Sequence, residues 1–438
     1  MSAVATKKDT SAKWLEQFEF TAPNRLGAAN PAVKEKQAKA IAQFAKTGIP
    51  DKKLEDFKYT NIRLYLNDEF GVKGNFDYLK PNDLLDYLIG GHPTITIVNG
   101  RFLKELSLLQ HLPKEVTVKN LFSVIKESGA VAGAEFNGTI TSDVNPLINL
   151  NTALVQDGVA ITVPKGYQCK EPIHILNIST GKDKTLFNPR NIIKLGEGAS
   201  LTVIETFRSI NLAEKAFTNL VTEMVVEKNA TLNNYILQEE DPKACRNDVR
   251  QVTVGTSGKF NSVVVSLNGG LIRNDLNISI NGENSEIHMH GLFVVKDGQH
   301  VDNHSLVEHN VPNCFSNELY KGIIGDGGTG VFNGKIFVKQ DAQKTNAYQS
   351  NKNILLGDNS TINTKPQLEI YADDVKCSHG TTTGRLDEEA LFYLQTRGLN
   401  EGIARKVLLG AFAKEISDTV KDEAFRTLLE ERIHDHIV

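Results

Sequence analysis

Apolar and polar residues alternate along the middle of the chain, from about residue 157 to residue 371. Successive side chains of an extended strand point to opposite faces, so this alternation predicts strands that each bury one face. We expect pairs such as Val263 and Val265, or Ile278 and Ile280, to point inward. Short segments rich in Gly and Asn separate the strands, and both residues accept the positive φ of tight turns at little cost.

The turn segments follow one plan, in which an apolar residue enters a short polar turn and another leaves it. The plan recurs at residues 195–202, 226–233, 254–261, 280–287, 324–331 and 356–363. The period is roughly 26 to 32 residues with one longer gap, which is the size of a solenoid coil. A single coil cannot bury its own apolar face, so neighbouring coils must stack and share a core. The pattern predicts a mostly β fold built on a parallel β-helix, with an antiparallel sandwich as the alternative.

Helix signals flank this region on both sides. Asn30 and Asn145 are each followed by Pro, which is typical of a helix N-cap and first helical position. Asp387 and Asn400 are N-cap candidates for two C-terminal helices, and a third amphipathic segment follows them. We therefore expect an N-terminal helical and α/β region (1–155), a parallel β-helix core (156–375) and a small C-terminal helical domain (376–438).

Composition excludes several classes of function. The 438 residues carry a net charge of −4, so we expect binding neither to nucleic acid nor to an acidic membrane surface. The apolar runs are too short to span a bilayer, and residues 1–9 lack a secretory apolar segment, so we expect a cytoplasmic protein. The four cysteines are widely spaced, which argues against a disulfide framework and against a zinc ribbon.

The sequence predicts no nucleotide site on this chain. Residues 325–330 match the dinucleotide-loop pattern by letters, but the following residues have the pattern of a strand where that loop requires a helix. The pair Gly334-Lys335 is followed by Ile336, and no Gly lies five positions before Gly334, so a P-loop is missing. We therefore expect no ATP or NAD site.

Histidines are concentrated between residues 288 and 309. His288 and His290 lie two positions apart, so on a strand they share one face, and imidazole suits Zn, Fe or Cu. No carboxylate or Cys falls at a recognised ligand spacing. A polar ladder along the solenoid is therefore the favoured interpretation, and His288 and His290 are the weaker metal candidates.

Cys377 and His379 form the sharper candidate site. Two residues apart on an extended segment, they point the same way and offer a thiolate and an imidazole, and thiolate suits iron–sulfur ligation. Two ligands do not complete a tetrahedral site, so a partner or a distant residue must supply the others. The alternative is an inert, buried Cys beside a hydrogen-bonded His.

The residues around this pair carry a family resemblance. The segment PQLEIYADDVKCSHG at 366–380, with FYLQTRG at 392–398, resembles the SufB/SufD family of the SUF iron–sulfur cluster assembly machinery, on its SufD side. VEHN at 307–310, FNG at 332–334 and EDFKYT at 55–60 fit the same family. SufB carries a cluster-building Cys shortly upstream, but here no Cys lies between Cys314 and Cys377, so the chain departs from the SufB pattern.

The resemblance implies an architecture and two partners. It implies a right-handed parallel β-helix that pairs with SufB edge to edge, and C-terminal helices that hold the SufC ATPase. Cys377 and His379 would lie at the SufB interface, with His379 the more direct contributor to a transient iron–sulfur cluster shared with SufB. The chain would then be a non-catalytic scaffold subunit, and an isolated chain could form a homodimer through its exposed β-helix edge.

Two other functions stay open from the residues alone. One is a stand-alone metal-binding β-helix protein that uses the histidines from His288 to His309. The other is a polysaccharide-active β-helix enzyme, although such enzymes are typically exported and residues 1–9 show no export signal.

Overall fold

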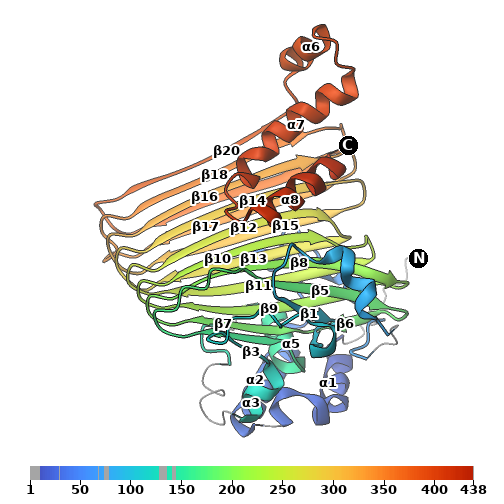
Figure 1. Ribbon diagram of the computed structural model, residues 1–438, viewed down its shortest axis with the longest axis vertical. Coiled ribbons are helices and arrows are strands. Elements are labelled where there is room, and N and C mark those ends of the chain that lie inside the picture. Colours follow the sequence, from blue (N-terminus) through green and yellow to red (C-terminus); the bar gives the residue numbers. More distant parts are fainter. Residues whose placement is uncertain are drawn as a thin grey trace, which may run out of the picture.

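The computed structural model describes residues 10–28, 30–67, 69–73, 78–127, 136–140 and 145–437. It is a β-solenoid of about eight turns, and 42% of the chain is strand. The strands stack along the long axis of the molecule, with N-terminal helices at one end and C-terminal helices at the other (Figure 1). Within the described residues, no helix is long and apolar enough to cross a membrane.

Two parallel sheets form the walls of the solenoid. The β20 sheet runs in the order β2 (Arg101–Phe102), β1 (Thr94–Val98), β5 (Ile173–Gly181), β8 (Ser200–Leu212), β10 (Thr231–Glu239), β12 (Lys259–Asn268), β14 (Glu286–Val295), β16 (Phe315–Ile324), β18 (Asn346–Leu355) and β20 (Lys376–Gly384). The β19 sheet runs in the order β19 (Thr361–Ile370), β17 (Thr329–Val338), β15 (His300–His309), β13 (Leu271–Ile280), β11 (Ala244–Val254), β9 (Ala216–Val226), β7 (Arg190–Leu195), β4 (Val159–Val163) and β3 (Thr117–Asn120), with β6 (Thr185–Phe187) beside β9.

The chain alternates between these sheets, so each coil contributes one strand to each wall. Neighbouring strands pair in parallel, except β1 with β2 and β3 with β4 at the N-terminal end. The parallel β-helix prediction is therefore confirmed, and the antiparallel sandwich is wrong.

The predicted turns lie at both sides of the solenoid. The first four connect the β19 sheet to the β20 sheet, and a residue with positive φ recurs in them at Gly198, Asn229, Ser257 and Asn284. The turns at 324–331 and 356–363 instead connect the β20 sheet back to the β19 sheet. The longer gap in the repeat therefore marks a change of side, because both turns of a coil use similar residues.

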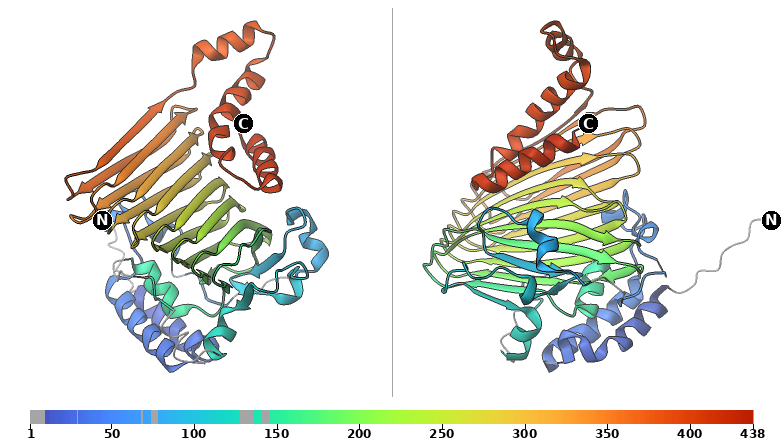
Figure 2. Two further views of the ribbon diagram at one scale, coloured as in Figure 1. Left: turned by 60° about the vertical axis from the view of Figure 1, so that its left-hand side comes forward. Right: turned by 45° about the vertical axis from the view of Figure 1, so that its right-hand side comes forward.

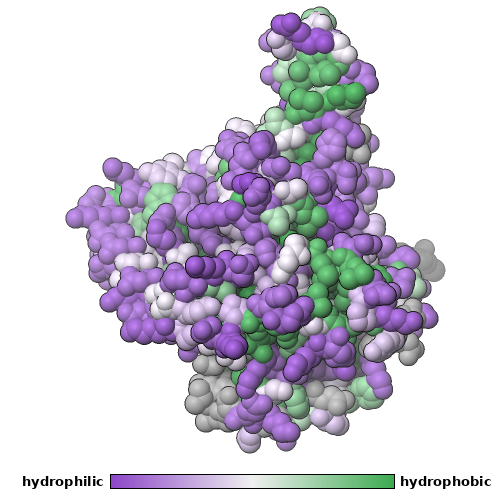
Figure 3. Space-filling view, viewed as in Figure 1, coloured by the Kyte–Doolittle hydropathy of each residue, from purple (hydrophilic) through white to green (hydrophobic). Residues whose placement is uncertain are grey.

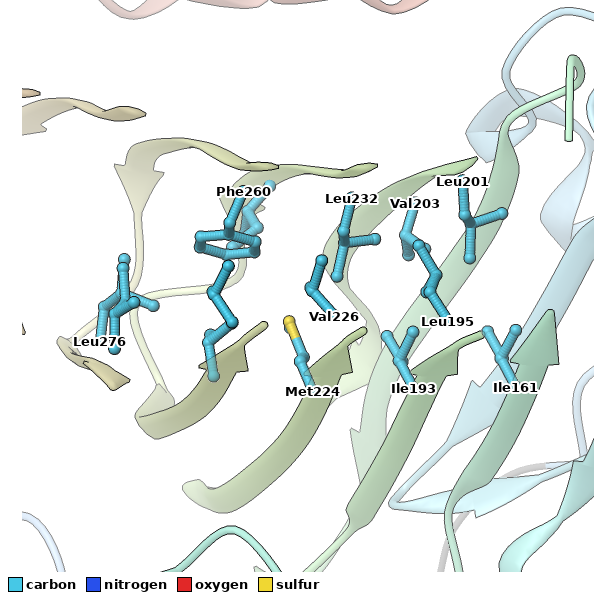
Figure 4. Packing of buried hydrophobic residues seen from close by; sticks show 14 of the residues in the cluster. Ile161, Ile193, Leu195, Leu201, Val203, Met224, Val226, Leu232, Phe260 and Leu276 are labelled. Carbon is cyan, nitrogen blue, oxygen red and sulfur yellow. The ribbon is translucent and has the colours of Figure 1, made fainter. Parts of the chain in front are cut away.

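Apolar side chains from the two sheets meet inside the solenoid. Ile161, Ile193 and Met224 project from one sheet toward Val203 and Leu232 on the other (Figure 4). Burying each such side chain stabilises the fold by about 1.5–3 kcal/mol. The core therefore runs along the axis of the stack, as the repeat predicts.

The outer face of the β20 sheet is also buried around β10 and β12. In β12, Phe260 and Val264 belong to the interior core, so Val263 and Val265 point outward, where they are covered by the C-terminal helices. The expectation that Val263 and Val265 face inward is wrong. Both faces of β12 are buried and apolar, so the sequence pattern does not show which face points into the solenoid.

Helices at the N-terminal end cover the outer face of the β19 sheet. They are α1 (Thr10–Phe20), α2 (Pro31–Thr47), α3 (Leu121–Glu127) and α5 (Pro146–Leu154), with the short 3₁₀ helices η1 (Ala22–Asn24), η2 (Leu26–Ala28), η3 (Glu55–Phe57) and η4 (Ile62–Leu64). Two further 3₁₀ helices, η5 (Pro81–Tyr87) and η6 (Lys104–Leu106), instead pack against β1 and β5 of the β20 sheet. Trp14 and Phe44 pack there against Phe217. Asn30 and Asn145 cap α2 and α5 with their side chains, which confirms the predicted start signals.

Three helices follow the last strand, namely α6 (Glu388–Thr396), α7 (Glu401–Ser417) and α8 (Glu423–His436). The ring of Phe425 stacks on Tyr235 of β10 at 6.2 Å between centroids, and Lys321 Nζ donates to the Phe412 carbonyl at 2.8 Å. α7 and α8 therefore lie against the β20 sheet, while α6 projects beyond the end of the stack (Figures 1 and 2). The sequence predicts the boundary between the β-helix and the C-terminal helical domain at residue 375. In the structure β20 follows that boundary and pairs with β18, so strand pairing continues to Gly384.

The interior also contains buried ions. The Arg250 guanidinium binds Glu205 on the facing sheet and Asp248 on its own strand, at 2.8 Å for the Asp248 pair, and all three side chains are at most 4% exposed. Asn234 accepts a further hydrogen bond from Arg250 at 3.0 Å. This cluster joins the two walls by charge-assisted hydrogen bonds in place of apolar contact.

Replacing Arg250 with Met should destabilise the chain by about 3–5 kcal/mol, because two buried carboxylates lose their counter-ion. Arg385→Met removes a pair with Asp358 that is 74% and 86% exposed, and it should cost at most about 1 kcal/mol. Urea unfolding monitored by circular dichroism measures both. Equal stability of the two variants would contradict a structural role for the interior cluster.

Candidate functional site

Among the described residues, the solenoid ends at a strand, β20, that is exposed along most of its length. β20 is the last strand of its sheet and pairs with β18, with Ala347 opposite Cys377 and Gln349 opposite His379. β19 is the last strand of the other sheet. We call this the open end, defined by β19 and β20, and it lies opposite the end covered by the N-terminal helices (Figures 1 and 2).

Cys377 and His379 share the interior face of β20. Cys377 packs against Val338, Ala347 and Ala372 inside the last coil. Side chains two apart on a strand point the same way, so His379 lies on the same face, and it is exposed. The extended segment on which that prediction rests is β20, which includes both residues.

The chemistry of Cys377 differs from that of the other cysteines. All four thiols are free, and Cys169, Cys245 and Cys314 are buried, whereas Cys377 is half-buried. Burial raises the pKa of Cys377 above its ordinary value, so the group is a neutral thiol at neutral pH. A metal that binds there must displace the thiol proton. Burial raises the pKa of Cys245 further, to about 12, which makes it a poor ligand.

His288 and His290 lie elsewhere, on the outer face of β14. The His288 ring bonds Glu286 at 2.8 Å and stacks on His290 at 6.3 Å between centroids. Burial lowers the pKa of His290 to about 4, so its ring is neutral. Across the described ranges, no group of three or more His, Cys, Asp or Glu side chains could hold a metal ion. His288 and His290 are therefore not brought to Cys377 or His379.

The other histidines occupy two further environments. On the outer face of β15, His304 pairs with Asp302 at 2.9 Å, and His300 bonds the Thr60 hydroxyl at 2.8 Å. His309 lies in the interior and bonds Ser316 at 2.9 Å. The run of histidines is thus divided between opposite faces and does not form one cluster.

The N-terminal motif EDFKYT at 55–60 fastens the N-terminal region to the solenoid. The Phe57 ring lies 4.2 Å from the Arg273 guanidinium of β13, and Thr60 donates to Asp302 of β15. Glu55 pairs with Lys365 of β19 at 2.6 Å. The motif therefore contacts three strands of the β19 sheet, namely β13, β15 and β19.

Sequence reasoning missed two polar residues beneath the open end. Glu318 of β16 and Gln349 of β18 are 1% and 3% exposed, and Gln349 Nε2 donates to Glu318 Oε2 at 2.7 Å. Burial raises the pKa of Glu318 to about 7, against the opposing hydrogen bond from Gln349. The two residues lie 31 positions apart, which is about the length of one coil. The repeat length could therefore have predicted that they are neighbours.

Two family descriptions match the chain. Residues 177–412 match the SUF system FeS cluster assembly, SufBD core domain. Residues 13–175 match the SufBD protein N-terminal region. The first match spans more than half of the chain, and it includes the open end with Cys377 and His379.

Curated relatives agree over most of their length. The iron–sulfur cluster assembly protein SufD of Escherichia coli is 32% identical over 409 residues, which are 90% of each chain. The iron–sulfur cluster assembly SufBD family protein slr0076 of Synechocystis is 30% identical over 384 residues, 85% of this chain and 84% of that protein. The protein ABCI7, chloroplastic, of Arabidopsis thaliana is 29% identical over 387 residues, 86% and 80% of the two chains. With a two-walled solenoid and matches that cover both its N-terminal region and its core, this chain belongs to the SufBD family of iron–sulfur cluster assembly proteins.

Proposed function

We propose that this chain is a non-catalytic scaffold subunit that builds an iron–sulfur cluster jointly with a SufB subunit. The observation that carries the proposal is the position of Cys377 and His379 on the interior face of the last, uncovered strand. A thiolate and an imidazole at an open end offer part of a ligand set to whatever covers that end. Family membership supports cluster assembly as the process.

The remaining ligands come from the partner. Two ligands leave a four-coordinate site half complete, and the described residues bring no third His, Cys, Asp or Glu side chain to the pair. The cluster would therefore be transient and shared between the subunits. It is assembled on the pair as cargo and then released.

The strand edges provide the means of pairing. β19 and β20 end their sheets, so each presents unpaired backbone groups along one side. A second solenoid of the same width can continue both sheets at once, and this continuation would seal Cys377 and His379 in a closed interior. A second copy of the chain presents the same edges, which is why an isolated chain can form a homodimer.

The C-terminal helices provide a separate surface for the SufC ATPase. Phe392 and Tyr393 of α6 are 67% and 56% exposed, and Ile403 and Val407 of α7 are each 47% exposed. These residues form the docking surface, and apolar residues are concentrated on this projecting part of the molecule (Figure 3). ATP hydrolysis in SufC would then move the helices.

That motion has a direct connection to the solenoid. Lys321 of β16 donates to the carbonyl of Phe412 and pairs with Glu415, both on α7. Because β16 and β20 are next-but-one neighbours in the same sheet, displacement of α7 would shear the open end. This connects ATP-driven movement to exposure of Cys377 and His379.

Replacing His379 with Ala should reduce cluster yield on the purified complex with SufB and SufC at least about tenfold, because a ligand of the shared site is lost. Cluster yield is measured from visible absorbance and from bound iron and sulfide. His288→Ala serves as the matched control, since His288 lies on the outer face, and its yield should be unchanged. An unchanged yield for His379→Ala would remove His379 from the site.

In the isolated chain, Cys377 should be alkylated before the three buried cysteines. The rate should rise with pH through a pKa above the ordinary thiol value, because burial disfavours the thiolate. Mass spectrometry after timed exposure to iodoacetamide measures this, and Cys377→Ser should remove the rapid phase. Addition of SufB should protect Cys377, and equal alkylation with and without bound SufB would contradict its place at the interface.

Double substitution of Phe392 and Val407 with Asp should abolish co-purification with SufC and leave SufB bound, because it places charge on the docking surface alone. Tyr371→Asp should show the reverse pattern, since Tyr371 is 61% exposed directly after β19. Pull-down of each variant from co-expressed subunits measures both. Loss of SufB from the helix variant, with SufC retained, would reverse the assignment of the two surfaces.

A further inference from the structure

A column of polar side chains lies inside the solenoid directly beneath His379. Parallel in-register pairing places Glu318 next to Gln349, and Gln349 next to His379, at the same position of three successive coils. Adjacent strands of a sheet are about 4.8 Å apart, so side chains on the same face of neighbouring rungs touch. The column therefore leads from the buried interior to the candidate ligand.

The amide of Gln349 is held from two sides. Its Nε2 donates to Glu318 Oε2 at 2.7 Å, on the side away from the open end. On the facing wall, a Cβ added to Gly334 would lie only 2.1 Å from Gln349 Nε2, so the absence of a side chain at Gly334 makes room for this amide. The Gly in the FNG motif at 332–334 is thus explained by the close approach of Gln349.

The orientation of the amide leaves one acceptor unused. With Nε2 committed to Glu318, the carbonyl oxygen of Gln349 faces away from that carboxyl group. This Oε1 is buried, and no residue in the described part of the chain donates to it. A buried carbonyl without a donor costs about 1–3 kcal/mol, so a donor on the next rung would be strongly favoured. The residue at that position of the next rung is His379.

We propose that Gln349 and Glu318 are positioning residues that fix the ring of His379. The structure holds no hydrogen bond between the described side chains of Gln349 and His379, so the exposed His379 ring must rotate for the Gln349 carbonyl to accept the N–H of one ring nitrogen, while the bond to Glu318 fixes the amide. The other ring nitrogen then carries the lone pair and faces the open end as a ligand. A hydrogen bond to one imidazole nitrogen selects the tautomer and orientation of a metal-binding His in this way.

The protonation state of Glu318 is compatible with this arrangement. Burial raises its pKa to about 7, so both protonation states are accessible near neutral pH. The Glu318 oxygen that faces Gln349 can accept in either state, because a neutral carboxyl group keeps a carbonyl oxygen. The hydrogen bond from Gln349 Nε2 is therefore compatible with both protonation states of the carboxyl group.

The test is the tautomer of His379 in the isolated, full-length chain, measured by nitrogen chemical shifts after ¹⁵N-histidine labelling. The His379 signals are identified by their loss in His379→Ala. In the parent chain, the tautomer ratio of His379 should differ by about fivefold from that of a solvent-exposed histidine, as expected from one hydrogen bond. In Gln349→Leu the ratio should return to that of a solvent-exposed histidine. An unchanged ratio in Gln349→Leu would overturn the proposal.

Four further variants separate positioning from folding. Glu318→Gln keeps an acceptor for Gln349 Nε2 and should retain the parent ratio, whereas Glu318→Leu should lose it. Gly334→Ala displaces the amide without removing any polar group, and it should also lose the preference. Gln367→Leu, on the outer face of β19 in the other sheet, makes the same chemical change away from the column and should leave the ratio intact. His288 in the same spectra should be unaffected throughout.

The effect of Gln349 on cluster binding rests on the proposed function. The effect of Gln349 on the tautomer of His379 does not depend on that function. If His379 has one tautomer that depends on Gln349, and His379→Ala still assembles clusters fully, the positioning holds and the proposed function fails. If His379→Ala loses clusters while Gln349→Leu changes neither tautomer nor yield, the proposed function holds and the positioning fails.

Discussion

In-register parallel pairing between coils is the constraint on which the whole structure depends. Because each strand pairs with the strand one coil away, a residue contacts the residues at the same position in the neighbouring coils. Residues at equivalent positions of successive coils therefore form columns along the axis. Whether a column is polar or apolar depends on residues about 30 positions apart in the sequence. One end of this stack is covered by the N-terminal helices, and the other ends in β19 and β20. The open end is a direct result of stacking, because a stack must terminate.

The interior is not uniformly apolar, and two of its polar clusters differ in their partners. Near the middle of the stack, Arg250 is enclosed by Glu205 and Asp248, so the charge of the guanidinium is compensated within the solenoid. Beneath the open end, Glu318 and Gln349 leave a carbonyl oxygen without a donor among the described residues. The Arg250 cluster joins the two walls, whereas the free Gln349 oxygen lies one rung from the exposed His379, where a single donor would satisfy it.

The peripheral elements are tied to the solenoid at specific strands. The 55–60 motif fastens the N-terminal region to β13, β15 and β19, and its contact with β19 reaches the last coil of that sheet. On the opposite wall, α7 is fixed to β16 by Lys321 and by the apolar contacts under α7 and α8. Both outer walls near the open end are thus connected to parts of the chain that lie outside the solenoid. Movement of the N-terminal region would act on β19, and movement of α7 would act on β16, which lies two strands from Cys377 and His379.

Local sequence determined the features that depend on neighbours within a few residues. The Asn-Pro starts of α2 and α5, the positive-φ turns and the shared face of Cys377 and His379 follow from hydrogen-bonding and strand geometry over two to four positions. The repeat length, together with the family resemblance, also indicated the solenoid and the process it serves.

Tertiary structure decided the features that depend on contacts between coils or with the helices. Val263 and Val265 point outward because α7 and α8 cover that wall, and an alternating pattern cannot show this when both faces are buried. The histidines from His288 to His309 separate because they fall on different faces of different strands. The column from Glu318 to His379 exists only because the coils pair in one register, and register depends on every strand of the stack at once.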